Sequence, residues 1–406
     1  MQKRFTPDEG GAFPEWEEKT LGECMTLIAS KGYKGKDLVN DEDKAIMFSP
    51  SDIDTFGVVS LVKNAHISDE LFKKSKEALV KNGDILFTKT ASIGKVGYVK
   101  NLDHNATINP QIVILRANEN VDSYFLFCAV RTETFKKQVR KISGGTTIKT
   151  MSQEALKKLK IKIPKSIEEQ RKIAAALSAY DEMIAVKTAK LEVWQECKKR
   201  MVKEIFDRTK RFKDDDGKEF PEWEEKTLGD VAEILKNNVN PQNNKNDSFT
   251  EYSMPAYDNE QTAEVMLGAA MKSSRKKMTK PVVLVNKLNV RKKRVWKVSN
   301  PESNAVCSAE FVPLASGDMD LDFLQQLCTT DDFTKYLMKN TTGTANSLQR
   351  VRPEVITDYT FKMPCIAEQQ KIGNFLAEID KEIQIQKEFI KTYAEGKKRM
   401  MKELMA

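Results

Sequence analysis

The sequence predicts a mixed α/β (α+β) protein with a pseudo-two-fold internal repeat: two tandem units, each ending in a long helix. Residues 3–22 recur as residues 210–229 with 15 of 20 positions identical, at an offset of 207. Residues 167–206 recur without a gap as residues 366–405, with 15 of 40 positions identical, at an offset of 199. Self-similarity at a fixed spacing indicates that one structural unit occurs twice. The segments between these repeats differ, which is expected when one scaffold recognises two different things.

Short strands and helices are expected in the middle of each unit. Each unit opens with Phe-Pro-Glu-Trp-Glu-Glu-Lys-Thr-Leu-Gly, which we expect to lead into a first strand or helix. Runs rich in β-branched and aromatic residues follow turn signals and predict strands at residues 84–89, 96–100, 112–116, 281–285 and 294–298. Helices are predicted at residues 123–141, 152–160 and 321–340.

The two repeated ends predict long helices that pair through one apolar seam. Apolar residues recur every third and fourth position over more than four heptads, which is typical of a coiled coil. Two polar positions interrupt both seams in register, Lys187 and Lys198 in the first, Gln386 and Lys397 in the second. Antiparallel pairing of the two helices is the most economical arrangement, and packing of each helix on its own unit is the alternative. The helix-pairing seam comprises Leu177, Ile184, Leu191, Trp194, Met201, Leu376, Ile383, Ile390, Tyr393 and Met400.

These patterns divide the chain into five segments. We expect a first domain at 1–165, a helix at 166–206, a charged linker at 207–219, a second domain at 220–364 and a second helix at 365–406. Because no apolar run approaches the roughly 20 residues of a membrane span, we expect no membrane association. The six cysteines show no metal-ligand spacing, and the start lacks the apolar stretch of a signal peptide, so we expect reduced buried thiols in a cytoplasmic protein.

Positive charge is concentrated in one stretch of the second unit. Residues 265–301 contain eleven lysines and arginines and no acidic residue, whereas the net charge of the whole chain is +8. A solvated charged face normally contains acidic residues as well, so this stretch favours a surface that binds a polyanion.

No catalytic or metal-binding residue is predicted. Asp8 followed by Glu17-Glu18-Lys19 is a distant match to the two carboxylates and one lysine of Mg²⁺-dependent nucleases, with Glu18 between the matching Glu17 and Lys19, but no apolar strands surround these residues to fix their geometry. We therefore expect a binding protein without an active site.

Several segments have the chemistry of nucleic-acid contact. Hydroxyl, ammonium and guanidinium groups can bind phosphate, glycines allow close approach to a backbone, and Asn, Gln and Arg can recognise purine edges. Both units place a flexible polar loop at a similar distance before the long helix. The candidate DNA-binding residues are Thr88, Lys89, Thr90, Ser92, Lys95, Arg140, Lys141, Ser143, Gly144, Gly145, Thr146, Thr147, Lys149, Arg275, Lys276, Lys277, Lys287, Arg291, Lys292, Lys293, Arg294, Thr342, Asn346, Gln349, Arg350 and Arg352.

These motifs, in this order, resemble the DNA specificity (S) subunit of type I restriction–modification systems over essentially the whole chain. The resemblance is carried by the repeated Phe-Pro-Glu-Trp block, by Gly-Asp-Ile-Leu-Phe-Thr-Lys-Thr at 83–90, by the Gly-Gly-Thr loop and by Glu-Gln-Arg-Lys-Ile-Ala at 169–174. The second unit departs from it, because Val-Leu-Val-Asn-Lys at 283–287 replaces the Gly-Asp-Ile-Leu pattern.

The resemblance implies a non-catalytic subunit that recognises double-stranded DNA. Each unit would be a target-recognition domain for one half of a bipartite site, and the paired helices would form a spacer that docks two methyltransferase (M) subunits. Restriction (R) subunits would complete the nuclease. S-adenosylmethionine, ATP and Mg²⁺ would belong to these partner chains, and this chain would hold no cofactor. Two alternatives stay open: a self-sufficient nuclease or methyltransferase, and a coiled-coil interaction protein with incidental basic patches.

Overall fold

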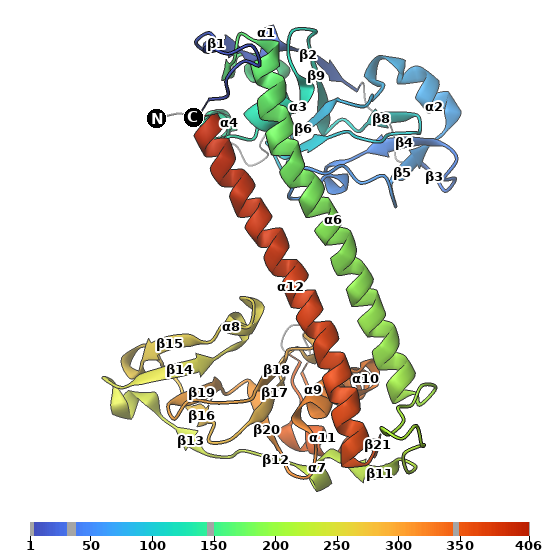
Figure 1. Cartoon of the computed structure of the whole chain (residues 1–406), viewed down its shortest axis with the longest axis vertical. Coiled ribbons are helices and arrows are strands. Elements are labelled where there is room, and N and C mark those ends of the chain that lie inside the picture. Colours follow the sequence, from blue (N-terminus) through green and yellow to red (C-terminus); the bar gives the residue numbers. More distant parts are fainter. Residues whose placement is uncertain (1–3, 31–37, 144–149, 344–348, 406) are drawn as a thin grey trace. The chain divides into compact units, whose positions relative to one another are not determined.

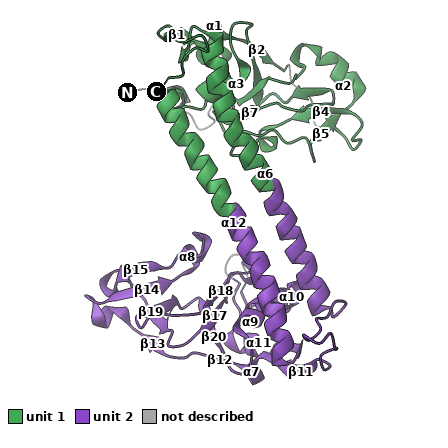
Figure 2. Cartoon of the chain, in the orientation of Figure 1, with its two compact units in different colours: residues 1–188, 387–406 green, residues 189–386 purple. Residues whose placement is uncertain are grey.

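The chain forms two compact units that each contain part of both long helices. The computed structural model describes residues 4–30, 38–143, 150–343 and 349–405 (Figure 1). Unit 1 comprises residues 1–188 with 387–406, and unit 2 comprises residues 189–386 (Figure 2). The long helices are α6 (Ile167–Phe206) and α12 (Ile366–Leu404). The five segments expected from the sequence are consecutive stretches of the chain. The two compact units are not, because the last residues, 387–406, belong to unit 1.

Unit 1 contains two four-stranded sheets with the strand orders β2-β9-β6-β7 and β3-β5-β4-β8, and a two-stranded sheet of β1 and β10. Its main core joins the first of these sheets to α3 and to both long helices, through Leu177 of α6 and Leu404 of α12. Its elements are β1 (Glu17–Thr20), α1 (Leu21–Cys24), β2 (Met25–Ala29), β3 (Leu38–Val39), β4 (Ala45–Phe48), β5 (Ala65–Ile67), α2 (Asp69–Lys74), β6 (Ile85–Thr88), β7 (Val96–Tyr98), β8 (Ala106–Ile108), β9 (Ile112–Ala117), α3 (Ser123–Ala129), α4 (Glu133–Ser143), α5 (Gln153–Lys157) and β10 (Lys160–Ile163).

Unit 2 repeats this plan with a larger second sheet. Its sheets have the orders β12-β20-β17-β18, β13-β16-β19-β14-β15 and β11-β21. Met201 and Ile205 of α6 and Leu376 of α12 join its main core. Its elements are β11 (Glu224–Thr227), α7 (Leu228–Val231), β12 (Ala232–Ile234), β13 (Asn238–Val239), β14 (Ser248–Tyr252), α8 (Met254–Asp258), β15 (Glu264–Leu267), β16 (Arg275–Lys277), β17 (Val282–Asn286), β18 (Val295–Val298), β19 (Ala305–Ser308), β20 (Phe311–Ser316), α9 (Leu321–Thr329), α10 (Asp331–Lys339), α11 (Pro353–Thr357) and β21 (Thr360–Met363).

The mixed α/β class, the tandem repeat and the two long helices are thus confirmed, and the predicted strands lie where they were expected. Two predicted helices are each broken in two by a threonine. In unit 1, Thr132 separates α3 from α4, and its hydroxyl accepts a hydrogen bond from the Phe135 amide at 3.3 Å. In unit 2, the Thr330 hydroxyl accepts from the Phe333 amide at 3.2 Å. Each threonine therefore caps a new helix that the apolar pattern did not separate from the preceding one.

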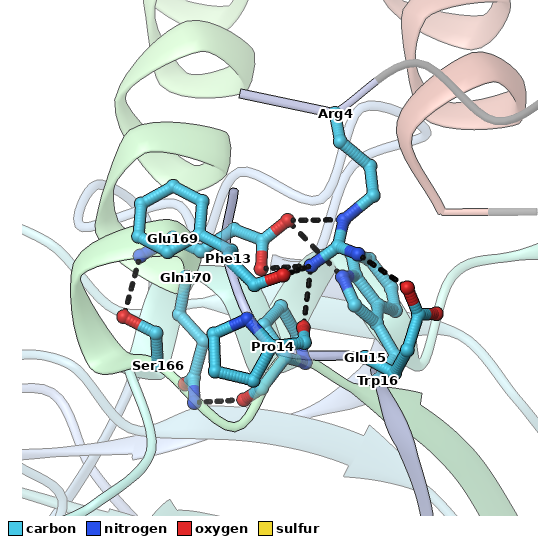
Figure 3. A network of polar contacts seen from close by, with 9 residues as sticks. Arg4, Phe13, Pro14, Glu15, Trp16, Ser166, Glu169 and Gln170 are labelled. Atoms are coloured by element: carbon cyan, nitrogen blue, oxygen red, sulfur yellow. Dashed lines mark hydrogen bonds and ion pairs between the residues drawn. The ribbon is translucent and has the colours of Figure 1, made fainter. Parts of the chain in front are cut away.

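The repeated Phe-Pro-Glu-Trp block is anchored to the start of α6 by a buried carboxylate (Figure 3). Glu169 is fully buried and accepts two hydrogen bonds at 3.0 Å from Arg4 and one at 3.2 Å from the Trp16 indole. Arg4 also donates to the carbonyl oxygens of Phe13 and Pro14. The Ser166 hydroxyl accepts from the Glu169 amide at 3.4 Å at the start of α6, whereas the Glu169 carboxylate binds Arg4 and Trp16.

Unit 2 contains the same network. Glu368 is fully buried and accepts hydrogen bonds from Arg211 and from the Trp223 indole, at 2.9 Å for the closest contact of each. Arg211 donates to the carbonyl oxygens of Phe220 and Pro221. The strongest sequence repeat therefore encodes a structural joint between the opening segment and a long helix.

Within each unit the two long helices run antiparallel. In unit 1, Tyr180 lies edge-on to Tyr393 at 6.5 Å between ring centroids, and Lys187 lies 4.3 Å from the centroid of Phe389. A Cβ atom on Gly396 would lie 2.8 Å from Tyr180 Cε1, so this glycine allows the tyrosine ring to approach the helix backbone.

Two of the polar seam positions form interhelical ion pairs, one in each unit. In unit 1, Lys397 is 6% exposed, and its Nζ lies 2.6 Å from both carboxylate oxygens of Asp181. The Tyr124 hydroxyl of α3 contacts both charged groups. In unit 2, Lys198 Nζ lies 2.6 Å from Asp380 Oδ1. Each ion pair therefore fixes the register of α6 against α12 within its unit.

The cysteines are less uniformly buried than predicted. Cys197 on α6 and Cys365 before α12 are half-buried, whereas the remaining four are buried: Cys24, Cys128, Cys307 and Cys328. Burial raises the pKa of the Cys24 thiol to about 11, so this thiol stays protonated near neutral pH.

Candidate nucleic-acid interface

In unit 1, the candidate interface is the hairpin loop 89–95 between β6 and β7. Thr88 is fully buried at the end of β6; its hydroxyl donates to the Ser92 carbonyl oxygen and accepts from the Lys95 amide at 3.0 Å. Ala91 and Gly94 take left-handed backbone conformations, with φ of 61° and 85°. Thr88 was predicted to bind DNA, but its buried hydroxyl instead holds the loop closed, and no part of the residue is open to a ligand.

In unit 2, loop 287–294 between β17 and β18 is closed in the same way. Asn286 is 2% exposed; its side-chain oxygen accepts from the Arg294 amide at 3.0 Å, and its amide nitrogen donates to the Leu288 carbonyl oxygen at 2.8 Å. The sequence did not single out Asn286, because Asn and Thr share no obvious motif. Only the strand register shows that Asn286 replaces Thr88.

Each hairpin is bridged to a residue that borders one of the polar segments predicted to contact DNA. In unit 1, Thr90 and Thr150 form an antiparallel bridge. In unit 2, Leu288 forms the corresponding bridge with Arg350, and the Asn289 amide donates to the Gln349 carbonyl oxygen at 2.9 Å. The structure therefore brings together segments about 60 residues apart in both units.

The basic stretch 265–301 is partly neutralised, contrary to the sequence interpretation. Among the described residues, five of its cations form ion pairs with acids from other parts of the chain. Hydrogen bonds from Arg294, for example, lower the pKa of Asp258. The acidic partners of these cations lie on other strands and helices, outside the stretch itself. The pairs are Arg275 with Glu251, Lys280 with Glu233, Lys293 with Asp331, Arg294 with Asp258 and Lys297 with Asp322.

Other cations of this stretch form no ion pair within the described part of the chain. Lys277, Arg291 and Lys292 are exposed, and Lys276 and Lys287 are half-buried. Burial of Lys276, together with the nearby positive charge of Lys287, lowers the pKa of Lys276. Two like charges held close to each other are stabilised by an anion between them.

The remaining candidates occupy varied positions. The Lys95 ammonium donates to the Pro50 carbonyl oxygen at 2.7 Å, and Arg350 pairs with Glu310 at 2.8 Å. Arg140 and Lys141 are exposed near the end of α4, which ends at Ser143, while Ser92, Thr342 and Arg352 are exposed in loops. The candidates outside the described residues are Gly144, Gly145, Thr146, Thr147, Lys149 and Asn346.

The three carboxylates of the nuclease-like match each pair with a different lysine. Asp8 pairs with Lys172, Glu17 pairs with Lys19, and Glu18 pairs with Lys160. Within residues 4–30, 38–143, 150–343 and 349–405, no group of three or more His, Cys, Asp or Glu side chains is arranged to hold a metal ion. No helix in the described ranges has the length and apolar content needed to cross a bilayer.

Known proteins resemble this chain in sequence and in fold. Two curated type I restriction enzyme specificity subunits of Methanocaldococcus jannaschii, MjaIX and MjaVIII, are 29% identical over 203 residues and 26% identical over 206 residues. These matches cover 48% and 49% of this chain, and 46% and 48% of those proteins. The chain thus spans about half the length of the curated relatives it matches.

Two solved structures have the same fold. The S subunit of a type I restriction–modification system from M. genitalium superposes with a TM-score of 0.63 at 15% identity, over 99% of both chains. A chain from a study of complex assembly and conformational transition of the type I restriction–modification system gives 0.51 at 15% identity, over 97% of this chain and 99% of that one. The family model described as the type I restriction modification DNA specificity domain matches residues 14–193 and 221–392. With one such domain in each repeat, the chain belongs to the family of type I restriction–modification DNA specificity subunits.

Proposed function

We propose that this chain is the subunit that recognises DNA for a type I restriction–modification enzyme, with each unit binding one half of a bipartite site. The observation that carries this proposal is the pair of equivalent hairpins, each closed by a buried side chain (Thr88 or Asn286) and each bridged to a distant segment through Thr150 or Arg350. The frame around the hairpins is constant, while the loop residues differ. A constant frame with variable loops suits a protein that binds DNA at two sites whose base sequences differ.

The chain itself supplies binding rather than chemistry. Exposed cations such as Arg291, Lys292 and Arg352 are suited to phosphate contacts, which position the protein on DNA without reading its sequence. Discrimination between bases would come from polar groups of the hairpin loops in the major groove. Adenine methylation with S-adenosylmethionine, and ATP-driven cleavage with Mg²⁺, would belong to the M and R subunits.

The long helices would set the distance between the half-sites. The ion pairs of Lys397 with Asp181 and of Lys198 with Asp380 hold α6 and α12 in one register. An α-helix rises about 1.5 Å per residue, so a fixed register converts helix length into a fixed spacing. This role requires the two pairs to act together, one in each unit.

Equivalent grooves in the two units supply candidate docking sites for two M subunits. The groove of unit 1 has a volume of about 980 Å³, and the groove of unit 2 has a volume of about 380 Å³. Both are lined by apolar side chains, lysines and a few carboxylates, and the lysines on the long helices would suit a partner segment with apolar and acidic side chains. Seven lining pairs on the two long helices are related by the offset of 199: Gln195 and Ala394, Lys198 and Lys397, Lys199 and Lys398, Val202 and Met401, Lys203 and Lys402, Phe206 and Met405, and Ile383 and Ile184.

Charge reversal at the two rims tests this docking. We expect Lys398→Glu with Lys402→Glu to weaken binding of one M subunit by tenfold or more. Like charges placed opposite each other at an interface cost several kcal/mol of binding free energy. A loss of about 1.4 kcal/mol is enough for a tenfold weaker affinity. Lys199→Glu with Lys203→Glu should weaken binding of the other. Native mass spectrometry would report the number of M subunits bound. Lys73→Glu with Lys76→Glu, exposed and outside both grooves, is the matched control. Two M subunits on the folded quadruple variant would contradict the docking proposal.

The function itself is tested by the methylation that depends on this chain. Cells that express the M subunit with this chain should methylate adenines in one bipartite motif, and cells lacking this chain should not. Incubation of the purified chain alone with Mg²⁺, S-adenosylmethionine and DNA should give no cleavage or methylation. Activity of the isolated chain would favour a self-sufficient enzyme instead.

A further inference from the structure

We propose that Lys89 and Lys287 are equivalent anchors, each binding one backbone phosphate of a DNA half-site. This inference rests on the proposed function, because it assigns the ligand class of that function to individual side chains. The sequence places Val-Leu-Val-Asn-Lys at 283–287 where unit 1 has Gly-Asp-Ile-Leu-Phe-Thr-Lys, but the structure is needed to show that the two lysines are equivalent.

Matching backbone hydrogen bonds hold the two lysines in place. The Lys89 amide donates to the Gln111 carbonyl oxygen at 2.8 Å, and the Lys89 carbonyl oxygen accepts from Met151 at 2.8 Å. The Lys287 amide donates to the Glu310 carbonyl oxygen at 2.9 Å, and its carbonyl oxygen accepts from Val351 at 2.9 Å. Because both backbone groups are bonded inside the fold, only the side chain of each lysine is available to a ligand.

The residue before each lysine closes the hairpin, as described for Thr88 and Asn286. The backbone amides of these two closing residues also have equivalent partners. The Thr88 amide donates to the Lys95 carbonyl oxygen, and the Asn286 amide donates to the Arg294 carbonyl oxygen. Each lysine is therefore the first residue after its strand, at equivalent positions of the two hairpins. A contact made from this position is held by a strand and is independent of the loop that follows.

The charges of Lys89 and Lys287 are available, unlike those of several cations around the second hairpin. Neither forms an ion pair among the described residues, whereas Lys293, Arg294 and Arg350 around the second hairpin all do. Lys276, which forms no ion pair within the described ranges, adds a second cation close to Lys287. In unit 2 this concentration of positive charge fits a phosphate, which accepts hydrogen bonds from ammonium groups and carries negative charge.

The loops that follow the two lysines differ in sequence. The lysines would therefore bind phosphate in both units, while the loops would recognise different bases. Loop residues 90–94 are Thr-Ala-Ser-Ile-Gly, whereas residues 288–293 are Leu-Asn-Val-Arg-Lys-Lys. An anchor at a fixed position lets loops of different length and chemistry meet the bases from a common starting point. Phosphate contacts then position each unit, and the loops specify its sequence.

The test compares Lys89→Ala and Lys287→Ala in the complex of the full chain with its M subunits, by DNA binding over a range of salt concentrations. Losing one phosphate contact should reduce the slope of log affinity against log salt by about 0.9, which corresponds to about eightfold weaker binding at 0.1 M salt. The loss should be the same for the cognate site and for sites with one changed base pair. Lys89→Arg and Lys287→Arg should retain most of the affinity.

Matched controls are Lys100→Ala in unit 1 and Lys280→Ala in unit 2, whose ammonium groups pair with Glu182 and Glu233. Both controls should leave the salt slope unchanged. An unchanged slope for Lys89→Ala and Lys287→Ala, in a complex that still binds DNA, would overturn the anchors but leave the proposed function standing. A changed base preference would also overturn them, because it indicates a base contact. Failure of the unaltered complex to bind any DNA would refute the proposed function itself.

Discussion

Asp181→Ala is expected to lower the free energy of unfolding by about 3–5 kcal/mol, because it leaves a buried cation without its counter-ion. Lys397 is 6% exposed, and both carboxylate oxygens of Asp181 lie 2.6 Å from its Nζ. The Tyr124 hydroxyl, at 3.3 Å, remains as an uncharged contact. Chemical denaturation of the purified chain, followed by circular dichroism, would measure the loss.

Controls separate the buried charge from other effects of this substitution. Glu182→Ala removes the adjacent carboxylate of an exposed pair with Lys100, and we expect a loss below about 1 kcal/mol. The double variant Asp181→Leu with Lys397→Met removes both charges and should recover most of the stability, since apolar replacement of a buried pair is often neutral or stabilising. A loss below 1 kcal/mol for Asp181→Ala would mean that this pair does not hold the helices in register.

Glu169→Gln is expected to lower the free energy of unfolding by about 3 kcal/mol. The substitution keeps the shape of the side chain but removes the negative charge that Arg4 and the Trp16 indole share. Glu368→Gln should have a similar effect through Arg211 and Trp223, because the second network repeats the first. Thermal and denaturant unfolding of each variant would measure these losses.

Glu15→Gln is the matched control for this network. Glu15 contacts the same guanidinium of Arg4 at 3.2 Å, but its side chain is 94% exposed. We therefore expect a change within about 0.5 kcal/mol. Equal effects of Glu15→Gln and Glu169→Gln would contradict the view that the buried carboxylate anchors the opening segment.

The sequence predicted the parts of the fold that depend on local pattern. The long helices follow from a heptad stripe that runs through Leu177, Ile184 and Leu191, and the strands follow from β-branched runs after turn signals. These signals are local, so they could be recognised without the fold. The break of the helix at Thr330 was missed, because the apolar pattern continues through a threonine that caps a new helix.

The electrostatics of the candidate interface could not be predicted in the same way. Lys293 and Arg294 are charged neighbours in the sequence, but Asp331 and Asp258 pair with them from distant helices. Only strand register shows that Asn286 occupies the position of Thr88, and hence that Lys287 corresponds to Lys89. Tertiary pairing, which no local pattern reports, thus decides which cations of the basic stretch stay available.

The central claim is that each unit reads one half of the DNA site. Its most direct test replaces residues 232–350 of unit 2 with the corresponding region of another specificity subunit and maps the methylated adenines in cells by sequencing. The account predicts that one half of the bipartite motif changes, while the other half and the gap between them stay the same. A change in both halves, or a single undivided motif before and after the exchange, would contradict it.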